Sequence, residues 1–141
     1  MKNIIITGIS GFVGQNLKKF IKDKYKIIGI SRNNNHKESL ISYENLSNSF
    51  LNDSNVIVHL AGKAHDLKKT SEDSEYFEVN TELTKTLFDR FLKSDCEVFI
   101  YLSSVKAAAD VVDGVLTEDV TPNPVTVYGK SKLAAENYIL S

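Results

Sequence analysis

A glycine-rich turn near the N-terminus constrains the fold of this chain more than any other feature. Three glycines at equal spacing, Gly8, Gly11 and Gly14, follow a run of three isoleucines and precede apolar residues at helical spacing. The pattern predicts a buried strand, a tight turn and a helix. Gly8 permits a sharp turn, Gly11 leaves room for a pyrophosphate beside the backbone, and Gly14 allows close packing of helix on strand. The helix N-terminus would offer N–H groups to an anion. An ordinary strand–helix turn is the alternative.

Beyond this turn the chain alternates apolar, β-branched runs with segments of helical periodicity. Further strands are expected at 26–30, 39–43, 55–60 and 97–102, with the second of these weak, and helices at 46–51, 74–93 and 125–140. This alternation is typical of an α/β protein with a parallel sheet. A length of 141 residues favours one domain, 1–141.

Composition excludes several classes of function. The formal net charge is -1, with 17 basic and 18 acidic residues, so nothing suggests a nucleic-acid or membrane partner. Cys96 is the only cysteine, which excludes an intrachain disulfide and favours a reducing compartment. The three isoleucines after Lys2 and Asn3 are too short a run for a signal peptide. The expected location is therefore the cytoplasm.

The end of the second predicted strand bears on the choice of cofactor. An acidic residue at this position in a dinucleotide-binding fold would bind the 2′-hydroxyl of NAD. Ser31 and Arg32 stand here instead, and a guanidinium can grip a 2′-phosphate. The pair favours NADP over NAD. Alternatively, Arg32 is a solvated loop residue or stacks on the adenine.

Small residues follow the strand predicted at 55–60. Leu60 runs into Ala61 and Gly62, and ligands of open α/β sheets bind outside such strand ends. His59, with His65 and Asp66 nearby, allows a metal or base interpretation. A packed, hydrogen-bonded histidine is the favoured one, and no metal site is predicted.

Polar residues also fall at positions that suit chemistry. Asn80 and Thr84 lie in the apolar stripe of the predicted helix 74–93. A buried amide must be paired, so Asn80 is expected to hold a backbone group or water near a site, unless it lies at the solvent edge. Tyr128 and Lys132 are one turn apart on the last helix and share a face. Pro124 is expected at the first helical position.

Taken together, these features resemble the extended short-chain dehydrogenase/reductase superfamily, the NAD-dependent epimerases, dehydratases and reductases of nucleotide sugars. The matching motifs, which occur in family order, are Thr7–Gly14, His59-Leu60-Ala61-Gly62, Asn80 with Thr84, Leu102-Ser103-Ser104, and Tyr128-Gly129-Lys130-Ser131-Lys132 with Glu136. Each motif is weak alone, and together they cover nearly the whole chain. The resemblance implies a Rossmann-type, doubly wound parallel sheet of about five strands, in the order 3-2-1-4-5 with right-handed crossovers.

The resemblance also implies roles for individual residues. Tyr128 is similar to the general acid/base of the family, Lys132 to its partner, and Ser104 to the hydroxyl that orients substrate. The implied cofactor is NADP or NAD. The residues expected to bind it are Gly8, Gly11, Phe12, Val13, Gly14, Ser31, Arg32, Leu60, Ala61, Gly62, Asn80, Tyr128 and Lys132.

The sequence only partly distinguishes between the reaction subtypes of this superfamily. Val105 and Lys106 follow Ser104, whereas the common nucleotide-sugar 4,6-dehydratases carry Asp-Glu there, so that reaction is disfavoured. The resemblance is greatest to 4-ketosugar reductases, with nucleotide-sugar 4-epimerases next. A non-catalytic dinucleotide-binding module is the alternative from another class.

Family members are considerably longer than this chain, which stops as the last predicted helix ends. We therefore expect a cofactor-binding portion truncated before a C-terminal substrate domain and inactive alone. The expected partners are a nucleotide-sugar substrate of the parent enzyme and a second copy, through helices 74–93 and 125–140.

Overall fold

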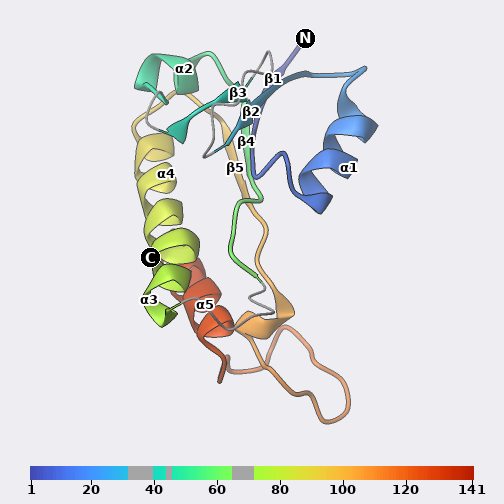
Figure 1. Cartoon of the computed structure of the whole chain (residues 1–141), viewed down its shortest axis with the longest axis vertical. Coiled ribbons are helices and arrows are strands. Elements are labelled where there is room, and N and C mark those ends of the chain that lie inside the picture. The colour runs from blue at the N-terminus through green and yellow to red at the C-terminus, as the bar shows by residue number, and fades with distance from the viewer. Residues whose placement is uncertain (32–39, 44–45, 65–71) are drawn as a thin grey trace. The chain divides into compact units, whose positions relative to one another are not determined.

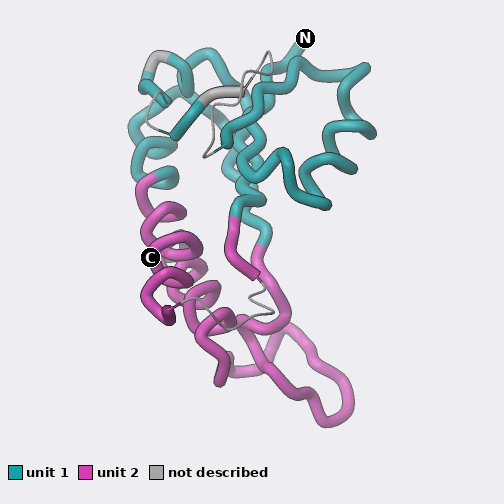
Figure 2. The backbone as a smooth tube through the Cα atoms, in the orientation of Figure 1, with its two compact units in different colours: residues 1–61, 87–102 teal, residues 62–86, 103–141 magenta. Residues whose placement is uncertain are grey.

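The computed structural model describes residues 1–31, 40–43, 46–64 and 72–141 (Figure 1). The strands are β1 (Asn3–Thr7), β2 (Lys26–Ile30), β3 (Leu40–Ile41), β4 (Val56–His59) and β5 (Val98–Tyr101). The helical segments are α1 (Phe12–Ile21), α2 (Asn48–Asn52), α3 (Asp73–Phe77), the π-helix η2 (Glu78–Glu82), α4 (Leu83–Leu92), the 3-10 turn η3 (Val105–Ala107) and α5 (Val127–Leu140). The chain divides into two compact units (Figure 2). Unit 1 comprises residues 1–61 and 87–102, and unit 2 comprises residues 62–86 and 103–141.

Unit 1 contains a parallel sheet in the order β3-β2-β1-β4-β5. This is the predicted doubly wound, Rossmann-type α/β fold, and the predicted strand order is confirmed. The central strand β1 pairs with β2 and β4, so that Ile5 lies between Ile28 and Ile57. The carboxyl ends of β1 and β4 therefore lie side by side, at Thr7 and His59.

The isoleucine run of β1 is buried on both faces of the sheet, as a central parallel strand requires. Ile4 and Ile6 form a cluster with Ile9 and Val58, against which Leu17 and other α1 residues pack. Ile5 points to the opposite face and has no exposed surface. On β5, Phe99 packs against two aromatic rings of α4, Phe88 and Phe91, at centroid distances of 5.3 and 5.4 Å.

Unit 2 is built around α5, which packs against η3, η2 and α3. The expected uninterrupted helix over 74–93 is wrong in detail, because residues 78–82 form a π-helix. Thr84 Oγ1 donates to the Asn80 carbonyl at 2.7 Å, and Thr86 Oγ1 donates to the Glu82 carbonyl at 2.9 Å. Such bonds compete with the backbone ladder and are a physical reason for its local widening.

The last helix also begins later than expected. Thr126 is its N-cap, and the Thr126 side chain accepts a hydrogen bond from the Gly129 N–H at 3.1 Å. The prediction of Pro124 at the first helical position is therefore wrong, because a threonine cap satisfies a helix N–H that proline cannot. Pro124 is instead a buried residue before the helix. Among the described residues, no helix has the length and apolarity to cross a membrane.

Candidate functional site

The turn after β1 has no room for side chains at two of its glycines. Gly8 adopts a φ of 66°, and a Cβ on it would lie 2.7 Å from the backbone nitrogen of Ala61. A Cβ on Gly14 would lie 2.4 Å from the Gly8 carbonyl oxygen and 2.6 Å from the Ile9 Cα. Real Cβ atoms do not approach backbone so closely. Because Gly8 and Gly14 have no side chains, the turn can pack directly against the end of β4 and the start of α1.

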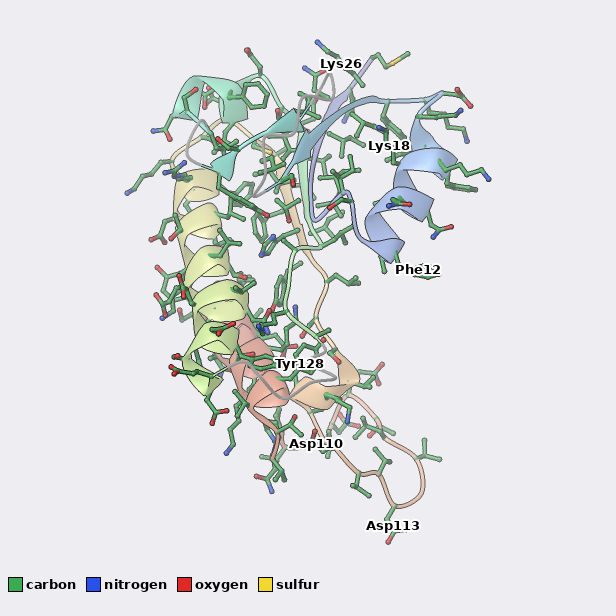
Figure 3. All side chains as sticks on the ribbon, in the orientation of Figure 1. Phe12, Lys18, Lys26, Asp110, Asp113 and Tyr128 are labelled. Atoms are coloured by element: carbon green, nitrogen blue, oxygen red, sulfur yellow. The ribbon has the colours of Figure 1, made fainter. Side chains whose placement is uncertain are left out.

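The N-terminus of α1 is open to an anion. Gly11 is its N-cap, no side chain caps it, and its first turn has no acidic residue. The Gly11 N–H donates to the Gly8 carbonyl at 2.9 Å, which closes the turn. The first helical N–H groups and the positive end of the helix dipole are features that favour a bound phosphate. Phe12, which is labelled in Figure 3, and Val13 are the first helical residues. They are 85% and 47% exposed.

A buried hydroxyl joins the ends of β1 and β4. Thr7 Oγ1 accepts from the backbone N–H groups of Leu60, at 3.2 Å, and Ala61, at 3.1 Å. It lies 2.6 Å from His59 Nδ1. Since two bonds occupy both lone pairs of the hydroxyl, its proton goes to Nδ1.

His59 is fully buried and stacks on Tyr101 at 5.7 Å. No group of three His, Cys, Asp or Glu residues in the described ranges could hold a metal ion. His65 and Asp66 lie outside the described residues. His59 is thus placed to shape the turn beside Gly8, together with Thr7.

The residues predicted to choose between NAD and NADP are only partly described. Ser31 follows β2 directly and is half-buried, whereas Arg32 lies outside the described residues. The preference for NADP therefore stays a prediction.

In unit 2, Asn80 joins the segment after β4 to α5. Its Oδ1 accepts from the Lys63 N–H at 2.7 Å, and its Nδ2 donates to the Lys63 carbonyl at 3.0 Å and to Ser131 Oγ at 2.9 Å. Asn80 is 1% exposed, so these bonds satisfy an amide that has no access to bulk water. The structure thus favours a backbone-holding role over a place at the solvent edge. A Cβ on Gly62 would lie 3.1 Å from Asn80 Oδ1.

The helix α5 carries Tyr128 (Figure 3) and, one turn later, Lys132. Tyr128 is half-buried, and Lys132 is 4% exposed. Burial lowers the pKa of Lys132 from 10.5 to about 8, against an opposing effect of the Glu136 charge. The lysine therefore stays mostly cationic at pH 7 while being much easier to deprotonate than a surface lysine.

Ser104 is the N-cap of η3 and directly follows Ser103. Its Oγ accepts from the Lys106 N–H at 3.2 Å, so the Ser104 O–H proton can still be donated to a ligand. A hydroxyl in this position can orient a carbonyl or alcohol oxygen, which is the chemistry predicted for it.

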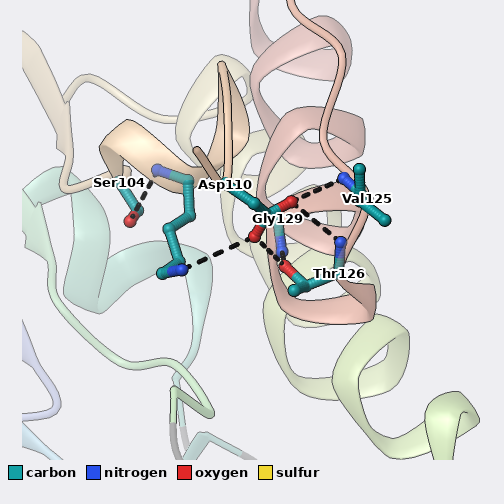
Figure 4. Close-up of polar contacts among 6 residues, drawn as sticks. Ser104, Asp110, Val125, Thr126 and Gly129 are labelled. Atoms are coloured by element: carbon teal, nitrogen blue, oxygen red, sulfur yellow. Dashed lines mark hydrogen bonds and ion pairs between the residues drawn. The ribbon is translucent and has the colours of Figure 1, made fainter. Parts of the chain in front are cut away.

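Asp110, which the sequence did not single out, ties η3 to the start of α5 (Figure 4). Its carboxylate accepts from the N–H groups of Val125 and Thr126, at 2.5 and 2.9 Å, and from Thr126 Oγ1 at 2.7 Å. The Lys106 ammonium lies 3.6 Å away. The Thr126 hydroxyl bond, followed by the two backbone bonds, lowers the pKa of Asp110 to about 2. Hydrogen bonds and an ion pair thus connect Ser104, through Lys106 and Asp110, to the start of the helix that carries Tyr128.

Known proteins are similar to this chain over nearly its whole length. The family model described as "NAD dependent epimerase/dehydratase family" matches residues 4–141. A UDP-glucose 4-epimerase of Vibrio cholerae is 34% identical, over 99% of this chain and 47% of its own length. A GDP-6-deoxy-D-mannose reductase of Pseudomonas aeruginosa is 24% identical, over 99% of this chain and 46% of its own length.

Among solved structures, MoeE5 in complex with UDP-glucuronic acid and NAD has a TM-score of 0.83 and 26% identity, covering 98% of this chain and 48% of MoeE5. The chain thus spans about half the length of the proteins that it resembles.

Proposed function

Because the chain belongs to the NAD dependent epimerase/dehydratase family, we propose that it is the cofactor-binding part of a nucleotide-sugar enzyme. The observation that carries this proposal is the turn Gly8–Gly14. It leads into an uncapped helix N-terminus, and it has no room for side chains at Gly8 and Gly14. This geometry fits the pyrophosphate of a dinucleotide, which needs close backbone approach and N–H donors.

The cofactor would be NAD or NADP, bound by residues of the turn and of the neighbouring strand end. A Cβ on Gly11 would lie 3.2 Å from the Gly8 carbonyl oxygen, so even an alanine would crowd the backbone of the turn. Leu60 and Ala61, fixed by Thr7, would border the cofactor. When bound, the nicotinamide would supply the hydride acceptor or donor.

Tyr128 would transfer the proton that accompanies the hydride. The Lys132 ammonium, one turn away on the same face of α5, would supply positive charge next to the reacting oxygen. The Ser104 hydroxyl would orient the reacting oxygen of the sugar. Asn80 would hold the backbone at Lys63 in place beside α5.

The substrate would be a nucleotide sugar that reacts at C4, by reduction of a 4-ketosugar or by epimerisation. The sequence pattern after Ser104 favours a reductase, whereas the relative with 34% identity is a 4-epimerase. The two are distinguished by stoichiometry: a reductase consumes one reduced nicotinamide per product, and an epimerase regenerates its cofactor in each turnover.

A second copy is proposed to pack through helices 74–93 and 125–140, which light scattering of the purified chain would test.

Tyr128→Phe in the complete enzyme is the test of this function. The ring remains and only the hydroxyl is lost, so cofactor affinity should be nearly unchanged while turnover falls by about 10²–10⁴-fold. Tyr138→Phe, on the same helix, is the matched control and should keep near-full activity. A Tyr128→Phe enzyme with unchanged turnover would refute the assignment. A wild-type enzyme that binds NAD(P) but turns over no nucleotide sugar would favour the non-catalytic module.

A further inference from the structure

Glu136 lies on α5 one turn after Lys132 and two turns after Tyr128, so the three side chains share one face of the helix. The proposed chemistry leaves this carboxylate without a role. In the structure the Ser103 hydroxyl donates to Glu136 Oε1 in a short hydrogen bond. Ser103 directly precedes Ser104, so this bond connects the segment that presents Ser104 to the helix that presents Tyr128 and Lys132.

The charge of Glu136 also bears on Lys132. Lys132 is 4% exposed, and a buried cation is costly without a compensating charge. The elements packed against α5 bring further charged residues: Lys106 of η3, Glu78 and Glu82 of η2, and Asp73 and Glu75 of α3. Lys106 lies by Asp110, and Glu75 binds Lys63 at 2.7 Å. Glu136 is the group whose charge raises the Lys132 pKa against the effect of burial.

We propose that Glu136 is a positioning residue for the proton-transfer site: through Ser103 it fixes the Ser104 segment against α5, and its carboxylate keeps the neighbouring Lys132 ammonium charged. Its importance for catalysis rests on the proposed function. Two separable effects follow, one geometric and one electrostatic. Glu136→Gln removes the charge and keeps an oxygen that can accept from Ser103. Ser103→Ala removes the hydrogen bond and keeps the charge.

The electrostatic effect is measurable in the 141-residue chain without substrate. A pH titration of the Lys132 side chain by NMR should give a pKa lower by about 1 unit in Glu136→Gln, the low end of the effect of an opposite charge nearby. Ser103→Ala should not lower it. Glu118→Gln is the control, because it removes one negative charge at an exposed position of the same unit. An unchanged Lys132 pKa in a folded Glu136→Gln chain would overturn the inference.

The geometric effect is measured in the complete enzyme. Ser103→Ala should lower kcat by about tenfold or more, since small misplacements of reacting groups are costly, and leave the alkaline limb of the pH profile in place. Glu136→Gln should move that limb to lower pH by about 1 unit, and Glu136→Asp should largely restore it. Full wild-type kcat in Ser103→Ala would overturn the geometric part. A wild-type enzyme that is inactive on nucleotide sugars would instead refute the proposed function. The NMR measurement of the Lys132 pKa would still test the electrostatic role of Glu136, because it needs no substrate.

Discussion

Replacing Gly129 by alanine tests the packing that places Tyr128. Gly129 follows Tyr128 on α5, and a Cβ there would lie 2.3 Å from the Lys106 carbonyl oxygen and 2.8 Å from the Pro124 Cβ. Ordinary contact begins at about 3.4 Å, so helix and η3 would have to separate by about 1 Å. The atom met most closely belongs to the backbone, which cannot rotate away as a flexible side chain can.

The expected loss of stability combines two opposing effects. Overpacking costs about 1–3 kcal/mol, and we take the upper part of that range because backbone must move. Alanine is favoured over glycine inside a helix by about 1 kcal/mol, which leaves a net destabilisation of about 1–2 kcal/mol. In the complete enzyme, a shift of about 1 Å between Tyr128 and the segment after Ser104 should lower turnover by about 10²-fold.

Urea denaturation of the 141-residue chain, followed by circular dichroism, measures the first effect. Lys130→Ala, at the exposed neighbouring position of α5, is the control and should stay within about 0.5 kcal/mol of wild type. A Gly129→Ala chain as stable as wild type, or more stable, would refute the reasoning. It would mean that α5 and η3 do not approach each other as closely as the structure shows.

Three further predictions concern charged residues. Lys132→Met should stabilise the chain at pH 7 by about 1–2 kcal/mol, which is less than the free energy that corresponds to the full pKa shift. The pKa of Lys132 is about 8 in the folded chain and 10.5 ordinarily, so burial of the lysine destabilises the fold below pH 8 and this cost is relieved between pH 8 and 10.5. The urea midpoints of wild type and variant should therefore converge in that range. Asp110 has a pKa of about 2 in the folded chain, below its ordinary 3.8, so its contribution to folding stability is present above pH 3.8 and is lost as pH falls toward 2. Asp110→Asn should therefore unfold at a lower urea concentration than wild type at pH 7, and the difference between the two urea midpoints should narrow in acid. Equal midpoints at pH 7 would contradict the role of its bonds to Thr126. Arg32→Ala should lower NADP affinity about tenfold or more and leave NAD affinity unchanged, and equal affinities of the wild-type chain for both cofactors by calorimetry would remove the predicted preference.

The fold could be predicted because its signals are local. Three isoleucines before Gly8 favour a strand that is buried on both faces, and the alternation with helices then favours a parallel sheet. Chirality and short connections limit the order of its strands. The glycine turn was predictable for the same reason, since the need for a left-handed residue at Gly8 is a property of the turn itself.

The site was less predictable where its contacts span long sequence separations. Asp110 lies 16 residues before Thr126, and no periodicity relates the two. The Thr126 cap could have been recognised from a threonine just before a helix, but its partner could not. The π-helix at Asn80 is accompanied by a Thr84 bond to a helix carbonyl, which the sequence offers as a possibility without requiring it. The Glu136–Ser103 bond likewise depends on tertiary packing.

Titration of NAD⁺ and NADP⁺ into the 141-residue chain by calorimetry tests the central claim most directly, with Gly11→Val beside the wild type. The account predicts that the wild-type chain binds a dinucleotide, and that a valine side chain at the cap of α1 abolishes binding because it occupies the space of the pyrophosphate. Circular dichroism and urea denaturation would establish that the variant is folded. Unchanged affinity in a folded Gly11→Val chain, or a wild-type chain that binds neither dinucleotide, would contradict it.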